Sequence, residues 1–280
     1  MPAVCRPLPA RRFLQNRFVY CVVSQRSGGL SVGINMNPDK ACNFDCVYCE
    51  VDRTHQKRTA RVNVGVMIAE LERMLETIHS GDLAALGYAA TPPELLPFKG
   101  VALSGDGEPT LCPNFLRILE AVIHLRARHR FPFFKLTLIT NATGLLLPEV
   151  RAGLKRFGSP DEVWAKLDAG TQRYMNRVNA PDVPLETVLR NIREFARRQP
   201  IVIQSLFPMI GGREPPAAEI LALARRLRKL KEQGAKIARV QVYSAHRPAI
   251  DAACAHLPLR SLSRIAQTIR EVSGLDAEVF

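Results

Sequence analysis

The feature that most restricts the fold of this chain is a repeated alternation between short apolar runs and helical patterns. Six apolar, β-rich runs occur, and a stretch with helical periodicity follows each of them. The runs show no clean alternation of polar and apolar residues, as expected for parallel strands that are buried on both faces. The predicted strands are residues 30–36, 100–104, 135–140, 162–167, 201–207 and 239–243.

The intervening stretches carry apolar residues at helical spacing. Ile220, Leu223, Leu227 and Leu230 form one apolar stripe, and the Lys and Arg residues around them fit a solvated face. Six strand–helix alternations predict an α/β fold with a parallel sheet inside and helices outside, wound by right-handed crossovers into an open or closed barrel. Other helices are predicted around residues 67–78, 114–126, 150–157, 186–197 and 262–272.

Neither a sequence repeat nor a low-complexity linker divides the chain. We therefore expect one domain over residues 25–280, preceded by an N-terminal extension over residues 1–24. The hydrophobic share of 47% is typical of a folded globular protein, and no apolar run approaches the ~20 residues of a membrane span. The apolar run "FVYCVV" is too short for the core of a signal peptide. These features predict a cytoplasmic protein without a membrane partner.

The formal net charge of +13 constrains the partners of the protein. Excess positive charge attracts polyanions such as nucleic acid and accelerates their encounter. It also occurs on proteins that bind only small anions, and no stretch carries an RRM, KH, zinc-finger or helix-turn-helix signature. The charge therefore leaves contact with nucleic acid open.

Three of the seven cysteines, Cys42, Cys46 and Cys49, lie within eight residues. Such clustering argues against three unrelated buried thiols, and the odd total argues against a disulfide scaffold. One interpretation is a structural zinc site, in which Cys46 and Cys49 form a C-x2-C pair and His55 is a nearby fourth-ligand candidate. The offset of four and then three residues is less natural for zinc.

The other interpretation of the cysteine triplet is an iron–sulfur cluster. A cubane has four irons that bind thiolates, so three cysteines on one loop leave one iron open. An open iron can bind a small chelate, such as the amino and carboxylate groups of S-adenosylmethionine. An electron-carrier cluster would usually be completed by a fourth cysteine, and none lies near the triplet.

The segment "CNFDCVYC" resembles the C-x3-C-x-aromatic-C signature of the radical S-adenosylmethionine (radical SAM) enzymes. The resemblance implies a six-strand partial (β/α)6 barrel of the TIM type and a [4Fe–4S] cluster held by the three cysteines. It also implies reductive cleavage of S-adenosylmethionine to a 5′-deoxyadenosyl radical, with Tyr48 packed near the adenine. The same chemistry requires an electron donor such as flavodoxin or ferredoxin.

The segment "SGDGEPTL" follows the second predicted strand and resembles the Gly-Gly-Glu motif of the same family. In that family the backbone and the acid receive the methionine ammonium, which assigns Gly105, Gly107 and Glu108 to cofactor binding. A tight polar turn closed by Pro109 is the alternative interpretation. Such a turn needs glycine but has no need of an acid at that position.

Later strand ends carry further polar residues that the resemblance assigns to the ribose or carboxylate of the cofactor. Asn141, in "TNATG", is similar to the Thr-Asn-Gly of many members, and a helix cap or asparagine turn is the alternative. Lys166 and Asp168, in "AKLDAGT", alternate with apolar residues, and a satisfied ion pair is the alternative there. Ser205 follows Gln204 and interrupts the fifth apolar run, and a location at the surface edge is its alternative.

Four segments together resemble a subgroup related to wyosine-base (tRNA) synthetases, usually found as iron–sulfur oxidoreductases: "SGGLSVGINMNPDKACNFDCVYCE", "SGDGEPTL", "AKLDAGT" and "VQVYSAHRP". Wyosine enzymes carry extra N-terminal cysteines for a second cluster. Here only Cys5 and Cys21 precede the triplet, and Cys112 and Cys254 are isolated, so we do not expect a second cluster. The pattern also overlaps with activating enzymes that install a radical on a partner protein.

The sequence therefore predicts a radical SAM enzyme whose substrate it does not identify. The basic charge favours an anionic substrate such as RNA, or an acidic electron donor. Tyr243, His246 and Arg247, in "YSAHRPA", are candidates for substrate contact, and a lone histidine supports a general base only weakly. No catalytic residue is assigned. The competing hypothesis is a module with a structural metal that binds nucleic acid.

Overall fold

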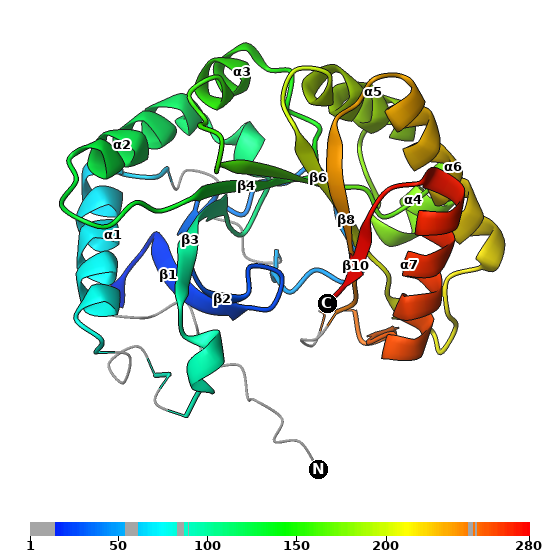
Figure 1. The fold of residues 1–280 in the computed structure, drawn as a ribbon, viewed down its shortest axis with the longest axis horizontal. Helices are drawn as coiled ribbons and strands as arrows, with labels where there is room; N and C mark the ends of the chain where they lie inside the picture. The colour runs from blue at the N-terminus through cyan, green and yellow to red at the C-terminus, as the bar shows by residue number, and fades with distance from the viewer. Residues whose placement is uncertain (1–14, 54–60, 83–86, 89, 246–248, 250) are drawn as a thin grey trace.

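A computed structural model describes residues 15–53, 61–82, 87–88, 90–245, 249 and 251–280. Its centre is an eight-stranded sheet in the order β1-β2-β3-β4-β5-β6-β8-β10, which curves so that helices cover its outside (Figure 1). Every neighbouring pair is parallel except β1 with β2. The strands are β1 Val19–Ser24, β2 Gly29–Asn35, β3 Phe98–Ser104, β4 Leu136–Thr140, β5 Glu162–Lys166, β6 Ile201–Leu206, β8 Ile237–Tyr243 and β10 Ala277–Val279.

The predicted α/β fold with a parallel sheet is confirmed. All six predicted strands form, as β2, β3, β4, β5, β6 and β8. The sheet also gains an edge strand at each end. At one end β1 forms a hairpin with β2, so part of the segment predicted as an extension belongs to the sheet. At the other end β10 adds in parallel to β8. A separate antiparallel ribbon joins β7 Met209–Ile210 to β9 Cys254–Ala255.

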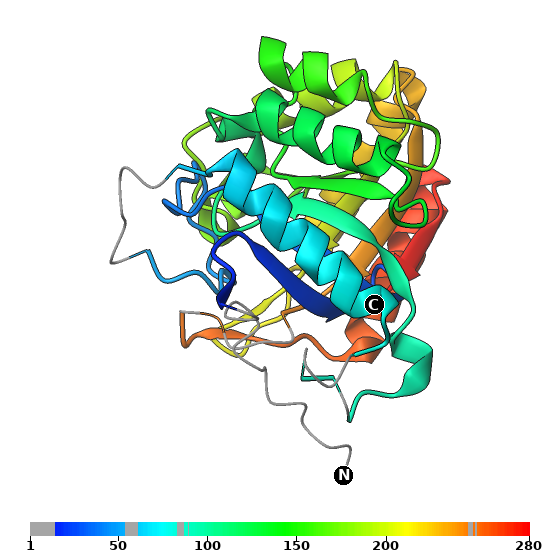
Figure 2. The ribbon, with the colours of Figure 1, turned by 90° about the vertical axis from the view of Figure 1, so that its left-hand side faces the viewer.

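Helices follow the strands and pack against the outer face of the sheet, and Figure 2 shows α1 and α2 lying outside β1 and its neighbouring strands. The predicted helices all form, and one helix was not predicted. That helix, α4, has only seven residues, and the side chain of Thr171 caps its first turn by accepting from the backbone N–H of Tyr174. The helices are α1 Val64–His79, α2 Phe115–Ala127, α3 Pro148–Leu154, α4 Gln172–Val178, α5 Leu185–Ala196, α6 Ala217–Glu232 and α7 Leu259–Ser273, with short 3-10 turns η2 Pro93–Leu95 and η3 Pro109–Leu111.

The core lies between the sheet and these helices, and all residues of β2 are buried. Because β2 to β6 are parallel, their carboxyl-terminal ends lie along one edge of the sheet. The loops that leave that edge carry the cysteine triplet, the glycine–acid segment and the later polar residues. In the described part of the chain, no helix is long and apolar enough to span a membrane.

Candidate functional site

The cysteine triplet lies on the loop between β2 and α1, which we call the cysteine loop (residues 36–53 of those the structure describes). Cys42, Cys46 and Cys49 are partly buried free thiols. The backbone N–H of Cys49 donates to the carbonyl of Cys46 at 2.9 Å, and the N–H of Phe44 lies 3.5 Å from the sulfur of Cys42. The loop therefore turns tightly at two of the three cysteines.

Loops from two neighbouring strands and a more distant segment hold the cysteine loop from one side. The backbone N–H of Glu108, after β3, donates to the carbonyl of Ala41 at 2.9 Å. The amide of Asn141, after β4, donates to the side-chain oxygen of Asn43 at 2.8 Å. The amide of Asn43 donates in turn to Asp182 at 2.9 Å. These contacts position the backbone on either side of Cys42.

The end of α4 holds the other part of the loop. The backbone N–H groups of Asp45 and Val47 donate to the carbonyls of Asn179 and Val178, each at 2.9 Å. These two bonds bracket Cys46. The protein thus positions its three thiols through its own backbone, at the edge where the parallel strands end.

Two glycines allow the loop after β3 to lie close to its neighbouring segments. A β-carbon on Gly107 would lie 1.9 Å from the carbonyl oxygen of Ala41, so no side chain fits there. Gly105 has φ +138°, and a β-carbon there would lie 2.2 Å from the side-chain oxygen of Asn35. The sequence predicted an approach to a ligand at these glycines. The structure shows that Gly107 is required for packing the loop after β3 against the cysteine loop, and Gly105 for packing it against Asn35 at the end of β2.

Glu108 is only 3% exposed, and both of its carboxylate oxygens already hold donors. One oxygen accepts from the backbone N–H of Thr110 at 3.0 Å, from the hydroxyl of Thr110 at 2.6 Å and from the hydroxyl of Thr140. The other accepts from the backbone N–H of Asn141 at 2.7 Å. Burial raises the pKa of this carboxyl, and the same donors oppose the rise. Glu108 therefore joins the ends of β3 and β4, and its contact with the methionine ammonium stays a prediction.

Asn141 and Ser205 are also engaged by the protein. The side-chain oxygen of Asn141 accepts from the N–H and the hydroxyl of Thr143 at 3.0 and 2.7 Å. Ser205 has no exposed surface, and its hydroxyl donates to the carbonyl of Leu167 at 2.6 Å. The predicted contact between Ser205 and the cofactor stays a prediction. The hydroxyl fastens β6 to the end of β5, which satisfies a buried polar group.

Asp168 is the centre of a buried network beside the cysteine loop, with a side chain only 1% exposed. One carboxylate oxygen accepts from the backbone N–H of Leu206 at 2.8 Å and lies 3.4 Å from the ammonium of Lys166. The other accepts from the amide of Asn179 at 2.8 Å and from the hydroxyl of Tyr48. Tyr48 is thereby held in one orientation. The network joins the cysteine loop to the ends of β5 and β6.

Lys166 is the member of this network that keeps some exposure, 17% for its side chain. Its ammonium donates to the hydroxyl of Tyr243 at 3.0 Å and lies 4.9 Å from the centre of the Tyr48 ring. Burial lowers the pKa of this ammonium, but Asp168 and Tyr243 raise it by more, so it stays above its ordinary value. A lysine has three N–H donors, and Tyr243 and Asp168 engage two of them. The third can bind an anionic group such as a carboxylate.

Asn179 is the site residue that the sequence did not indicate. Its side-chain nitrogen lies 3.3 Å from the sulfur of Cys46, 2.9 Å from the hydroxyl of Tyr48 and 2.8 Å from Asp168. It follows α4 rather than a strand, so its position carried no signal at the level of sequence. Tyr243, at the end of β8, was only a candidate for substrate contact, and the structure brings it to Lys166.

Burial favours the protonated form of two of the cysteine thiols on this loop. Burial raises the pKa of Cys42 to about 11; Glu108 and Cys49 add to the rise and Arg53 opposes it. Burial raises the pKa of Cys46 to about 12, with a further contribution from Asp168. These thiols are therefore protonated in the free protein, and a bound metal must displace their protons.

The donor set fits a cluster that takes three protein thiolates. Thiolates are the usual ligands of iron–sulfur clusters, and the nearby acids Glu108 and Asp168 are occupied by internal donors. The other cysteines that the structure describes lie on β1, after η3 and on β9, not on this loop. Among the described residues, no three His, Cys, Asp or Glu side chains converge as ligands of a single metal ion. His55, considered as a zinc ligand, and His246 and Arg247, considered for substrate contact, lie outside the described residues.

Comparison with known proteins shows the class to which this fold and site belong. Residues 36–227 match the Radical SAM superfamily, so the chain belongs to that family. A UPF0026 protein of Helicobacter pylori strain J99 is 26% identical over 235 residues, which cover 82% of this chain and 67% of that protein.

Two solved structures share the fold at low identity. A radical SAM methyltransferase from Sphaerobacter thermophilus aligns with a TM-score of 0.65 at 17% identity, over 94% of this chain and 68% of that one. TYW1 with a lysine-pyruvate adduct bound aligns with a TM-score of 0.53 at 16% identity, over 96% of this chain and 78% of that one. The predicted resemblance to radical SAM enzymes is confirmed, and with it the partial barrel. The protein is a radical SAM enzyme, and its family uses a [4Fe–4S] cluster and S-adenosylmethionine.

Proposed function

We propose that Cys42, Cys46 and Cys49 hold the [4Fe–4S] cluster and that this chain cleaves S-adenosylmethionine to abstract hydrogen from a substrate. The observation that carries the proposal is the cysteine loop, which is tied to the ends of β3, β4 and α4 by the protein's own hydrogen bonds. Three thiols are thereby presented at the edge of a parallel barrel where such enzymes build their sites. The triplet leaves one iron open for the cofactor.

A bound cluster would supply the electron for reductive cleavage of S-adenosylmethionine to methionine and a 5′-deoxyadenosyl radical, which would take a hydrogen atom from the substrate. The residues of the chain bind and orient the reactants. In this proposal the free N–H of Lys166 binds the carboxylate of S-adenosylmethionine, and the ring of Tyr48 packs near the adenine. Gly105 and Gly107 let the loop after β3 approach Asn35 and Ala41 closely, and in this proposal the backbone of that loop binds the methionine ammonium.

The residues with occupied polar groups act by positioning others. Glu108 joins two strand ends, and Asn179 joins Cys46 to Tyr48 and Asp168. Hydrogen bonds to the residues that ligate a metal fix the orientation of those ligands and tune the metal. We also propose a flavodoxin or a ferredoxin as electron donor, which the basic charge supports because such carriers are acidic and would be attracted to it.

The proposal is tested under anaerobic conditions. The full chain is loaded with iron and sulfide, then mixed with dithionite and S-adenosylmethionine, and 5′-deoxyadenosine is measured by chromatography. We expect the product from the native chain and none from Cys42→Ser, Cys46→Ser or Cys49→Ser, which should also lack cluster absorbance. Cys254→Ser, a change to a partly exposed cysteine on β9, is the matched control and should keep both. Full cluster absorbance in Cys46→Ser would refute the ligand assignment.

A further inference from the structure

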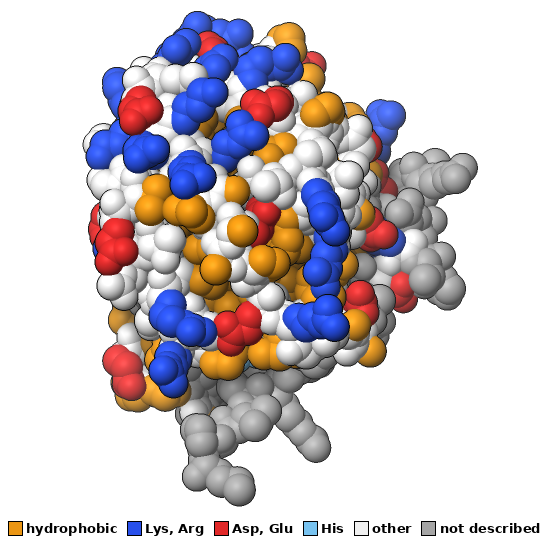
Figure 3. Space-filling model, turned by 90° about the vertical axis from the view of Figure 1, so that its right-hand side faces the viewer, with side chains coloured by type: hydrophobic (Ala, Val, Ile, Leu, Met, Phe, Trp, Pro, Cys, Tyr) orange, Lys and Arg blue, Asp and Glu red, His pale blue; other side chains and the backbone are white. Residues whose placement is uncertain are grey.

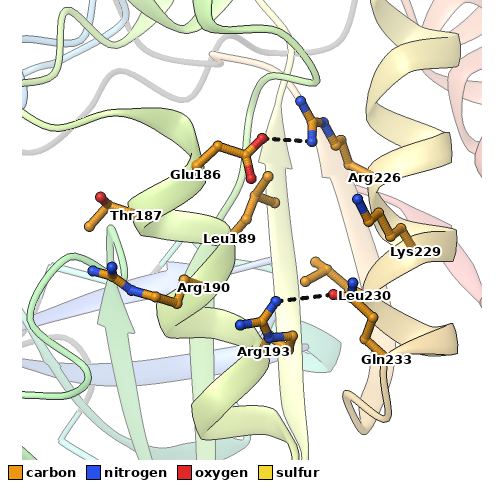
Figure 4. A pocket seen from close by; sticks show the side chains of 9 residues that line it. All are labelled: Glu186, Thr187, Leu189, Arg190, Arg193, Arg226, Lys229, Leu230 and Gln233. Carbon is orange, nitrogen blue, oxygen red and sulfur yellow. Dashed lines mark hydrogen bonds and ion pairs between the residues drawn. The ribbon is translucent and has the colours of Figure 1, made fainter.

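A groove of about 300 Å³ lies between α5 and α6, on the outer helical layer of the barrel (Figure 4). Arg190 and Arg193 line it from α5, and Arg226 and Lys229 line it from α6. Four cations around one groove are costly in self-repulsion unless anions neutralise them. The question is therefore how many of these charges the protein pairs itself.

Two of the four cations have partners within the protein. Arg226 forms an ion pair with Glu186 at 2.7 Å, which bridges the two helices. Arg193 lies 3.1 Å from Glu194 and donates to the side-chain oxygen of Gln233 at 3.3 Å, a second bridge. Both bridges are visible in Figure 4, one at each end of the groove.

Arg190 and Lys229 have neither an ion pair nor a side-chain hydrogen bond with any residue that the structure describes. Both are exposed and line the groove; Lys229 extends from α6 toward α5, whereas Arg190 extends from α5 away from α6 (Figure 4). An open groove with two unpaired cations and two bridged arginines is suited to an anion. Phosphate groups accept hydrogen bonds from Arg, Lys, Thr and Gln side chains, and Thr187 and Gln233 also line this groove.

The floor of the groove indicates which part of a phosphate-bearing ligand it recognises. Leu189 and Leu230 are its apolar lining residues, and both are buried. No aromatic residue lines it. Proteins that recognise unpaired bases stack them on aromatic side chains, so this groove is built for a backbone and not for bases.

The cations continue beyond the groove, which favours a chain of phosphates over a single one. Figure 3 shows Lys and Arg side chains gathered at the upper part of the face that α6 and α7 form. On α5, Arg190 and Arg193 are followed at helical spacing by the exposed Arg197, the residue just after the helix. Arg197 is itself paired with Glu194 at 3.3 Å. On α6, further exposed cations are Arg225, Arg228 and Lys231. Arg228 lies 3.8 Å from Glu232, and Lys231 donates to the carbonyl of Gly274 at 2.7 Å.

We propose that the α5–α6 groove binds the phosphate backbone of RNA without reading its sequence. RNA is favoured over DNA because Glu186 pairs with Arg226 through one carboxylate oxygen and keeps the other at the groove. A carboxylate accepts from a ribose 2′-hydroxyl, which DNA lacks, and would repel a bare phosphate. The proposal concerns a surface distinct from the cysteine loop and does not rest on the proposed radical chemistry.

The test measures binding of the full chain to fluorescently labelled bulk tRNA by anisotropy, at several salt concentrations. The groove variant combines Arg190→Glu and Lys229→Glu. We expect its Kd to rise at least about tenfold, and the slope of log K against log salt to fall by about 2, roughly one per lost phosphate contact. The control combines Lys99→Glu and Arg117→Glu, two exposed cations on β3 and α2, and should change Kd less than about twofold. Equal losses in the two double variants would overturn the proposal.

Two unlabelled competitors test whether the groove prefers RNA over DNA and over free phosphate. Unlabelled DNA of matched length should compete more weakly than RNA, and millimolar inorganic phosphate should displace little tRNA. Equal competition by DNA would overturn the choice of RNA, and ready displacement by phosphate would overturn the backbone site. Formation of 5′-deoxyadenosine without RNA should be unchanged in the groove variant. A failure of the RNA site is thereby distinguished from a failure of the radical chemistry.

Discussion

The side-chain nitrogen of Asn179 lies 3.3 Å from the sulfur of Cys46 and donates to Asp168 at 2.8 Å. One amide thus connects a proposed cluster ligand with the carboxylate that holds Lys166 and Tyr48. The residue is 2% exposed, so this amide is shielded from water. A hydrogen bond to a cluster sulfur stabilises the reduced, more negative cluster and raises its reduction potential.

Asn179→Ala should therefore lower the reduction potential of the loaded cluster. We expect a decrease of roughly 60 mV, which corresponds to a tenfold change in a one-electron equilibrium. Potentiometric titration followed by EPR measures it directly. Asn176→Ala, at an exposed position on α4, is the matched control and should leave the potential unchanged. An unchanged potential in Asn179→Ala would remove the tuning role and leave Asn179 a structural residue.

Lys166→Met should weaken binding of S-adenosylmethionine while leaving the cluster in place. The change removes the one donor of the network that remains free for a carboxylate, and a charge-assisted hydrogen bond contributes about 1.5–3 kcal/mol, or at least a tenfold change in Kd. Calorimetry on the loaded protein measures the affinity, and absorbance reports the cluster. Lys155→Met, at an exposed position after α3, serves as control. Native affinity in Lys166→Met would exclude a contact with the carboxylate.

Glu108→Gln separates the two roles considered for this acid. The carboxylate accepts from two backbone N–H groups and two hydroxyls, and an amide would turn N–H donors toward some of them. We expect the free energy of unfolding of the free protein to fall by about 1–3 kcal/mol, as for a buried polar group that loses its partner. Urea unfolding measures the loss. A variant with native stability but weakened binding of S-adenosylmethionine would instead support the predicted contact with the ammonium.

The sheet was predictable because buried parallel strands appear as continuous apolar runs, whatever their tertiary partners. β1 and β10 were not predicted, because an edge strand depends on the neighbour that it pairs with more than on its own pattern. α4 is shorter than the stretch needed to show helical periodicity. Local sequence patterns were therefore sufficient to predict the central strands, whereas the edge strands depend on tertiary contacts.

The site was predictable in location but only partly in roles. The motifs placed polar residues at the strand ends, where the structure finds them. Which polar groups are already engaged depends on residues far apart in sequence, such as Glu108 with Asn141 and Ser205 with Leu167. Gln204 likewise donates to Gln241 of the neighbouring strand at 2.8 Å. Only the tertiary structure distinguishes Lys166, with a donor to spare, from residues whose donors and acceptors are occupied.

The surroundings of the Glu162 carboxyl, at the start of β5, allow us to predict how acid affects the stability of the barrel. Burial raises the pKa of its carboxyl, but donation from Trp164 at 2.8 Å and Lys135 at 3.0 Å lowers it by more, with help from Arg239, so it lies below the ordinary value. A depressed pKa means that the unfolded chain binds the proton more tightly than the folded one. The stabilisation is therefore complete above the unfolded pKa of about 4.3 and is lost as the pH falls through the lower folded value.

Glu162→Gln should remove this contribution and flatten the acid limb of the stability curve. Because the side chain is 23% exposed, solvent screening limits the effect at neutral pH to about 1 kcal/mol. Urea unfolding of both proteins between pH 3 and about 7 measures the difference in the free energy of unfolding. The difference should be largest at neutral pH and should shrink below pH about 4, where the native carboxyl also becomes protonated. A difference that stays constant with pH would show that the variant lost packing and hydrogen bonds rather than a charge.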